Sequence, residues 1–148
     1  SPQIGSKRIS KHLLEIDLLP NLVITIDTTP LFQTAGGVAL YTNFWEKRPC
    51  VINQKVVDMT MDIQRTITSL DSNVRLANNI NDYITYGIEL NIDPERPIPS
   101  IAVEPAIFPY HQVGECVFVD DIIRTNQLIN KILEKYCDES TMAESKFQ

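Results

Sequence analysis

Basic residues and histidines are scarce in this sequence, and it has no long apolar runs. The chain of 148 residues has 13 Lys plus Arg against 19 Asp plus Glu, which gives a net charge of −6. This balance disfavours a protein that holds nucleic acid tightly through phosphate contacts. No apolar run approaches the roughly 18 residues of a membrane span. We therefore expect no membrane partner.

Cysteine is also rare, and its three copies are widely spaced. Cys50, Cys116 and Cys137 form no CxxC motif and no Cys/His cluster, which disfavours a structural zinc site. Reduced thiols are typical of the cytoplasm or nucleus. The N-terminal segment lacks the apolar core of a signal peptide, and there is no N-x-S/T sequon. The sequence thus predicts an intracellular protein that is not secreted.

The motifs of several large enzyme classes are missing. There is no GxGxxG, GxxxxGK[ST], HExxH or GxSxG in the chain. Neither of the 2 histidines has a Cys or Ser at motif spacing. A mechanism based on a side-chain nucleophile therefore has no support, and whether the chain is an enzyme stays open.

The composition is that of an ordinary globular protein. Apolar residues make up 43% and charged residues 22% of the sequence. Since this length suits one core, we expect a single domain over residues 1–148. Residues 1–8 are expected to be frayed, and residues 138–148 to form a polar tail.

The segment 22–41 organises the rest of the chain. Branched apolar residues up to Ile26 predict a mostly buried strand, with Asp27 at its end. Gly36–Gly37 then break the chain before a second strand, 38–41, which we expect to return as a hairpin. A carboxylate at this position is either a metal ligand or an ordinary turn residue, and the sequence leaves both open.

Weaker patterns predict the elements that follow. Residues 9–18 suit a short helix or an edge strand. A third strand is predicted over 50–57, and a helix from Asp58 through the apolar stripe that follows. Residues 74–82 suit a short central strand, and 83–92 a mixed helix and strand region.

The last third of the chain is easier to interpret. Three prolines within 93–99 predict a loop. Residues 101–108 predict a strand that Pro105 interrupts, and 109–114 a second loop. Asp120 or Asp121 can cap an amphipathic helix that continues to Tyr136. Together the elements predict an α/β or α+β fold, with a mixed sheet and helices packed on it.

Carboxylates at the ends of apolar segments are the remaining candidates for chemistry. They are Asp27, Asp62, Asp82, and Asp120 with Asp121. Hard divalent cations such as Mg²⁺ take oxygen ligands, and two such ions can activate water for phosphodiester cleavage. Each acid also has a structural interpretation: a turn at Asp27, the first helical turn at Asp62, a loop at Asp82, and an N-cap at Asp120 or Asp121.

This arrangement of acids resembles a ribonuclease H-like domain of the retroelement type. The segments that carry the resemblance are ITIDTT followed by AGGVALY, a helix with Asp62 where the family prefers Glu, and Ile80-Asn-Asp82. His111 lies in a loop ten residues before Asp121. The resemblance covers about residues 22 to 130. It implies Mg²⁺ held by Asp27, Asp62, Asp82 and Asp121, with His111 assisting proton transfer.

Two functions from different classes follow, and one weaker alternative. The first is a non-catalytic protein-interaction or assembly domain of a larger complex, on a degenerate ribonuclease H-like fold. It would dock on a protein partner through apolar surface and the C-terminal helix, and it needs no cofactor. The second is a Mg²⁺-dependent nuclease that cleaves RNA/DNA hybrids. Richness in Asn and Ile suggests a viral or phage structural protein as the weaker alternative.

Overall fold

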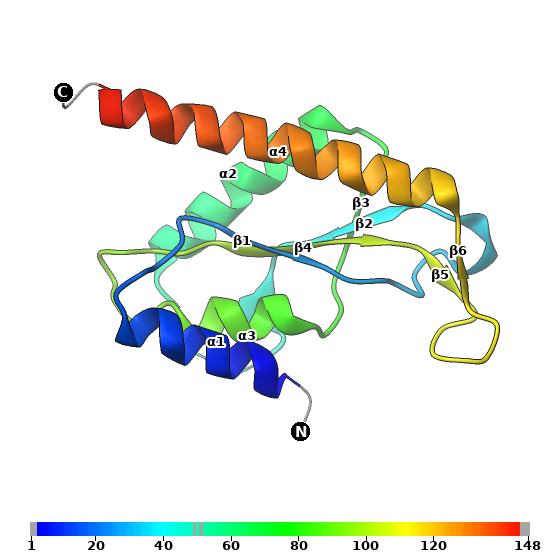
Figure 1. The fold of residues 1–148 in the computed structure, drawn as a ribbon, viewed down its shortest axis with the longest axis horizontal. Coiled ribbons are helices and arrows are strands. Elements are labelled where there is room, and N and C mark those ends of the chain that lie inside the picture. Colours follow the sequence, from blue (N-terminus) through cyan, green and yellow to red (C-terminus); the bar gives the residue numbers. More distant parts are fainter. Residues whose placement is uncertain (1–2, 49, 51, 146–148) are drawn as a thin grey trace.

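The computed structural model describes residues 3–48, 50 and 52–145. Helices and strands alternate in a mixed order along the chain (Figure 1). The α-helices are α1 (Ile4–Glu15), α2 (Gln54–Leu70), α3 (Asp82–Glu89) and α4 (Val119–Ser145). The strands are β1 (Val23–Ile26), β2 (Val38–Tyr41), β3 (Arg75–Ala77), β4 (Ser100–Pro105), β5 (Ile107–Phe108) and β6 (Cys116–Val117). Two 3-10 turns are η1 (Gln33–Ala35) and η2 (Phe44–Glu46).

The main sheet has four strands in the order β1-β4-β2-β3. This mixed sheet with its packed helices confirms the predicted α/β or α+β class. β1 is parallel to β4, β2 is antiparallel to β4, and β3 is parallel to β2. The predicted hairpin of 22–27 with 38–41 is therefore wrong, because β4 lies between the two strands. β1 becomes an edge strand, half-buried instead of mostly buried.

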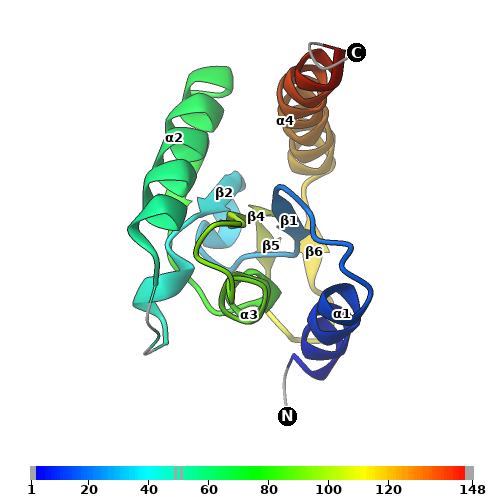
Figure 2. The same cartoon turned by 90° about the vertical axis from the view of Figure 1, so that its left-hand side faces the viewer.

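Helices cover both faces of this sheet (Figure 2). α2 and α4 lie on one face, and α3 lies on the other with α1 packed against it. Successive strand residues point to opposite faces, so β2 and β4 divide their side chains between two cores. The core under α2 and α4 contains Val38, Leu40, Ile63, Ile67, Val74, Ile101, Val103, Leu128 and Ile132. The core under α3 contains Phe32, Ala39, Tyr41, Phe44, Val56, Tyr83, Ile84, Ala102 and Ala106.

A helix replaces part of the third strand predicted over 50–57: residues 54–57 lie in α2, and residue 51 lies outside the described residues. The side chain of Asn53 accepts a hydrogen bond from the Lys55 backbone N–H and so caps α2 one residue later, at Gln54. Val56 and Ile63 then point into the core, in the spacing of a helix and not of a strand. The helix predicted from Asp58 is correct in type but begins four residues earlier.

The structure corrects parts of both predictions for the region from 74 to 92. β3, Arg75–Ala77, is the short strand expected within 74–82, but it lies at the edge of the sheet and not at its centre. The mixed region 83–92 is a single helix, α3, followed by coil. The Asn81 side chain accepts from the Tyr83 backbone N–H and caps α3. Asp82 therefore opens a helix and does not end a strand.

Both chain ends are more helical than expected. Within the segment 1–8 that was predicted to be frayed, residues 4–8 form the first turns of α1, and residues 1 and 2 lie outside the described residues. Residues 138–145, predicted as a tail, continue α4; residues 146–148 of that prediction lie outside the described residues. Among the residues that the structure describes, no helix combines the length and apolar character needed to cross a bilayer.

Candidate functional site

Asp27 and Asp82 line one pocket. This pocket has a volume of about 330 Å³ and lies along β1, with the N-terminal turns of α3 as its other wall. Asp27 follows the last residue of β1 and accepts a hydrogen bond from the Thr28 backbone N–H at 2.8 Å. Asp82 accepts from the Ser6 hydroxyl at 2.7 Å. The structure thus brings two of the four predicted acids together.

Glu104 is a buried carboxyl behind this pocket that sequence reasoning missed. Its side chain is 1% exposed, and Asn81, which lines the pocket, donates to its Oε1. Oε2 has no hydrogen-bond partner among the described residues. Burial, and then the charge of Asp27, raise the pKa of Glu104 to about 8. The group is therefore protonated at neutral pH, which is how a buried carboxyl avoids an unpaired charge.

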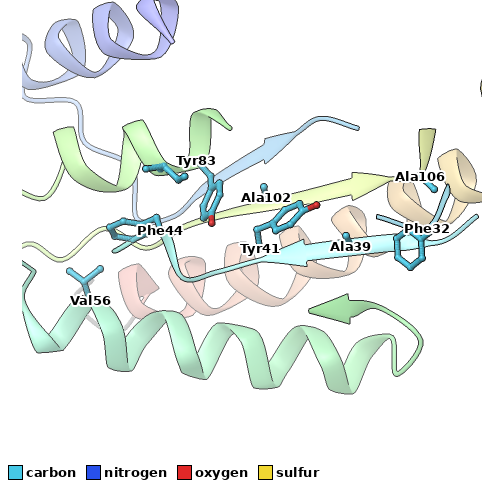
Figure 3. Close-up of a cluster of buried hydrophobic side chains, with 9 residues drawn as sticks. Phe32, Ala39, Tyr41, Phe44, Val56, Tyr83, Ala102 and Ala106 are labelled. Atoms are coloured by element: carbon cyan, nitrogen blue, oxygen red, sulfur yellow. The ribbon is translucent and has the colours of Figure 1, made fainter. Parts of the chain in front are cut away.

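Two buried tyrosines, Tyr41 and Tyr83, lie near this carboxyl and complete the polar cluster. Figure 3 shows both rings among the apolar side chains of the core under α3. The rings of Tyr41 and Tyr83 stack with centroids 6.1 Å apart. The Tyr41 hydroxyl shares a hydrogen bond of 2.6 Å with the Thr29 hydroxyl. Burial raises the pKa of both phenols, and the nearby Glu104 raises it further. The cluster is thus neutral, and it fixes α3 on the sheet beside the pocket.

Asp62 lies apart from the other predicted acids. It occupies the middle of α2 on an exposed surface, where it pairs with Arg65. An ion pair between exposed residues three apart is ordinary helix-surface chemistry. The structure therefore does not bring Asp62 to the pocket of Asp27 and Asp82.

Asp121 joins the start of α4 to the start of β2. Its Oδ2 accepts from the Gly37 backbone N–H at 2.7 Å. Gly36, at φ +72°, has no room for a side chain, because a Cβ there would stand 2.9 Å from both Asp121 Oδ2 and the Phe118 ring. The Asp121 carboxylate thus does not cap its own helix as expected. It binds a backbone group 84 residues away in the sequence. Gly37 lies at the end of the sheet where β1 finishes.

His111 lies in the loop between β5 and β6. Its backbone N–H donates to Glu115 at 3.1 Å, and its ring stacks on Tyr110 with centroids 3.8 Å apart. Burial and the charges of Asp27 and Glu104 raise the pKa of Tyr110. The loop is thus within electrostatic reach of the β1 end, but the structure places His111 against its own loop.

The predicted residues do not fit a magnesium centre as a set. In the ranges 3–48, 50 and 52–145, no group of three or more His, Cys, Asp or Glu side chains could hold a metal ion. Of the four predicted acids, Asp27 and Asp82 line one pocket, whereas Asp62 pairs with Arg65 and Asp121 bonds to Gly37. We therefore derive no reaction step through a metal ion.

Large exposed apolar side chains gather where the β5–β6 ribbon leads into α4. We call this region the apolar surface. It comprises Phe108, Tyr110, Val113, Phe118, Val119, Ile122 and Ile123. A pocket of about 320 Å³ lies between the β5–β6 ribbon and the start of α4. Phe108 lines it on β5, and Phe118 lines it just before α4. Scattered apolar residues are normal on a protein, but a group of large ones beside an apolar pocket is a candidate binding surface.

The sequence around the apolar surface explains its exposure. β5 and β6 pair over two residues each and project beyond the main sheet (Figure 1). On α4, Thr125 and Leu128 turn inward to the sheet, so Ile122 and Ile123 are left on the outward side of the helix. The helix is amphipathic as predicted, with a second apolar stripe that its own core does not cover.

Arg124 fixes the direction in which α4 presents this surface. Its guanidinium binds Asp71, just past the end of α2, through bonds of 2.7 and 2.9 Å. The hydrogen bond from Arg124 lowers the pKa of Asp71. A two-bond contact between planar groups restrains orientation as well as distance. The part of the apolar surface on α4 is thus held in place by two contacts, one at the start of β2 and one just past the end of α2.

No protein-family model, curated protein or solved structure matches this chain.

Proposed function

We propose that this chain is a protein-interaction or assembly domain of a larger complex, and that it docks on a protein partner through the apolar surface. The observation that carries the proposal is the exposure of adjoining large apolar side chains. Phe118 and Ile122, for example, are 50% and 47% exposed. Covering such side chains releases about 25 cal/mol for each Å² removed from water, so these residues suit the centre of an interface.

The position of the apolar surface also supports docking. Its side chains on α4 belong to a helix with two anchors, Asp121 on Gly37 and Arg124 on Asp71. A binding surface on a rigid element loses little conformational entropy when the partner binds. The pocket between Phe108 and Phe118 offers a place for an apolar side chain of the partner.

We place this activity inside the cell, in the cytoplasm or nucleus. Cys50 and Cys116 form no disulfide within the part of the chain that the structure describes. Exposed reduced cysteines such as Cys116 are usual where glutathione and thioredoxin keep thiols reduced.

The test compares affinity capture by two matched double variants. Phe118→Ser with Ile122→Ser removes the centre of the apolar surface. Ile80→Ser with Ile92→Ser removes two apolar side chains that are 62% and 68% exposed, one just before α3 and one just after it. Wild type and the control variant should retain the same proteins from a cell extract. We expect the first variant to retain about tenfold less of these proteins, or lower amounts still.

Circular dichroism and melting temperature establish that both double variants are folded before capture. Equal retention of every captured protein by the two variants would contradict the proposal, because the apolar surface would then make no contribution to binding.

A nuclease remains the second candidate, because Asp27 and Asp82 do line one pocket. The ribonuclease H-like resemblance is also kept as a proposal here. Mg²⁺- or Mn²⁺-dependent cleavage of a labelled RNA/DNA hybrid, lost in Asp27→Asn, would favour this candidate over a non-catalytic domain. An absence of cleavage by the folded wild type would remove it.

A further inference from the structure

The outer edge of β1 is the second surface that the fold leaves open. In the described sheet, β1 pairs only with β4. The Val23 backbone N–H bonds to the Pro99 carbonyl at 2.9 Å, and successive residues of a strand turn their main-chain groups to alternate sides. The N–H and C=O groups of Ile24 and Ile26 therefore point away from β4, toward the free edge.

This edge lacks the devices that proteins use to block strand pairing. Edge strands are commonly protected by lysine, proline, a bulge or an inward-pointing charge. β1 reads Val-Ile-Thr-Ile and has none of these. Ile26 is 63% exposed. A short, apolar, branched and unprotected edge suits the addition of another strand.

The pocket beside this edge is acidic. All four residues of β1 line it, together with Asp27, and α3 contributes its other wall. No ion pair involves Asp27 or Asp82 in the part of the chain that the structure describes. Tyr86 also lines the pocket, and an aromatic ring favours a cation near its face.

The buried carboxyl of Glu104 lies behind the pocket, is protonated at neutral pH and adds no charge to it. Asn81 links the pocket wall to this carboxyl. The charged groups of the pocket are Asp27 and Asp82, and neither pairs with a basic side chain among the described residues. The chemistry favours a ligand with a positive charge and several N–H donors.

We propose that the edge of β1 binds an extended segment of a protein partner by strand addition, with a lysine or arginine of that segment seated between Asp27 and Asp82. Main-chain hydrogen bonds to Ile24 and Ile26 supply the affinity, and the acidic pocket selects the basic side chain. This surface is distinct from the apolar surface, so the two proposals stand or fall separately.

The first test uses labelled nine-residue peptides and fluorescence anisotropy. The probe alternates valine and threonine around a central arginine; one control carries glutamate at the centre, and a second carries proline beside the centre. We expect the arginine peptide to bind about tenfold or more tightly than either control, with affinity falling as salt is added. No binding of the arginine peptide at about 1 mM, or equal binding of all three peptides, overturns the proposal.

The second test uses variants of the protein. Ile26→Pro removes an N–H that points away from β4, so it blocks addition without breaking the sheet. Asp27→Asn with Asp82→Asn removes the pocket charges, and Asp58→Asn with Asp62→Asn makes the same charge change on α2. We expect at least about a tenfold loss of arginine-peptide binding in the first two variants and none in the third.

Two outcomes identify a different occupant or a different site. Self-association of wild type in the analytical ultracentrifuge that Ile26→Pro abolishes would show a second copy of this chain on the edge, and would overturn the proposal. Loss of peptide binding in Phe118→Ser with Ile122→Ser would place the peptide on the apolar surface, and would also overturn it. Circular dichroism checks the fold of each variant.

Discussion

Glu104→Gln is expected to remove most of the pH dependence of the unfolding free energy between about pH 5 and about pH 8. In the folded chain, burial first and the charge of Asp27 second raise the pKa of this carboxyl from the ordinary 4.5 to about 8. Between these values the folded chain holds a proton that the unfolded chain releases. Raising the pH through this window therefore favours unfolding.

The contribution of Glu104 to stability is thus fully present below its ordinary pKa and is lost as the pH rises through about 8. The slope is at most about 1.4 kcal/mol per pH unit for one group. Glutamine keeps the shape and the oxygen that Asn81 contacts, but it has no proton to release. Urea unfolding of wild type and variant across the window measures the difference between the two slopes.

Two further variants separate this cause from others. Glu89→Gln changes an exposed glutamate of α3, and we expect it to leave the slope of wild type unchanged. Asp27→Asn removes the second cause of the shift and so lowers the folded-state pKa of Glu104, and the loss of stability should therefore end at a lower pH than in wild type. Equal slopes in wild type and Glu104→Gln would show that the buried carboxyl is not protonated in the folded chain.

Gly87→Ala is expected to destabilise the chain, although alanine is the better helix former. A Cβ on Gly87 would stand 2.5 to 2.7 Å from three atoms of the Phe44 ring. That ring is 1% exposed and cannot swing into solvent. Overpacking of a full core costs about 1–3 kcal/mol, which exceeds the gain of up to about 1 kcal/mol in helix propensity.

The matched control is Gly5→Ala, in α1. No atom lies within 4 Å of a Cβ at this position, so only the propensity gain applies, and we expect unchanged or higher stability. Urea denaturation of both variants measures the two changes with opposite signs. A Gly87→Ala variant as stable as Gly5→Ala would contradict the packing of α3 on η2.

The sequence predicted the elements whose local pattern is strong. Strands at 22–27 and 38–41 and the amphipathic stripe of α4 were visible from spacing alone. The fold class followed from their order, and the structure confirms it. The strand predicted over 50–57 was wrong because two short apolar runs concealed a helix start. The available signal was Asn53, a strong N-cap residue just before Gln54.

The strand neighbours could not be predicted, because pairing over long separations leaves little trace in local pattern. Two apolar strands with a Gly-Gly pair between them suggest a hairpin, yet β4 inserts between them from about 60 residues away in sequence. This one pairing makes β1 an edge and opens the acidic pocket. The free edge and its proposed ligand were therefore invisible in the sequence.

The candidate site was predicted only in part. Asp27 and Asp82 meet at one pocket, but Asp62 and Asp121 have other partners. Glu104 was missed, and the signal for it was a single charge inside the otherwise apolar run 101–107. Burying a carboxyl in such a run costs folding free energy, so a lone charge in an apolar strand is a signal worth following to a functional site.

The measurement that tests the interaction proposal most directly is site-specific photo-cross-linking. The photoreactive residue p-benzoylphenylalanine replaces Phe118 in one protein and Ser69, on the exposed side of α2, in the other. Each protein is irradiated in a cell extract, and its adducts are resolved by mass. We predict discrete adducts from position 118 that position 69 does not give. Equal labelling from both positions would contradict the assignment of the apolar surface as the docking site.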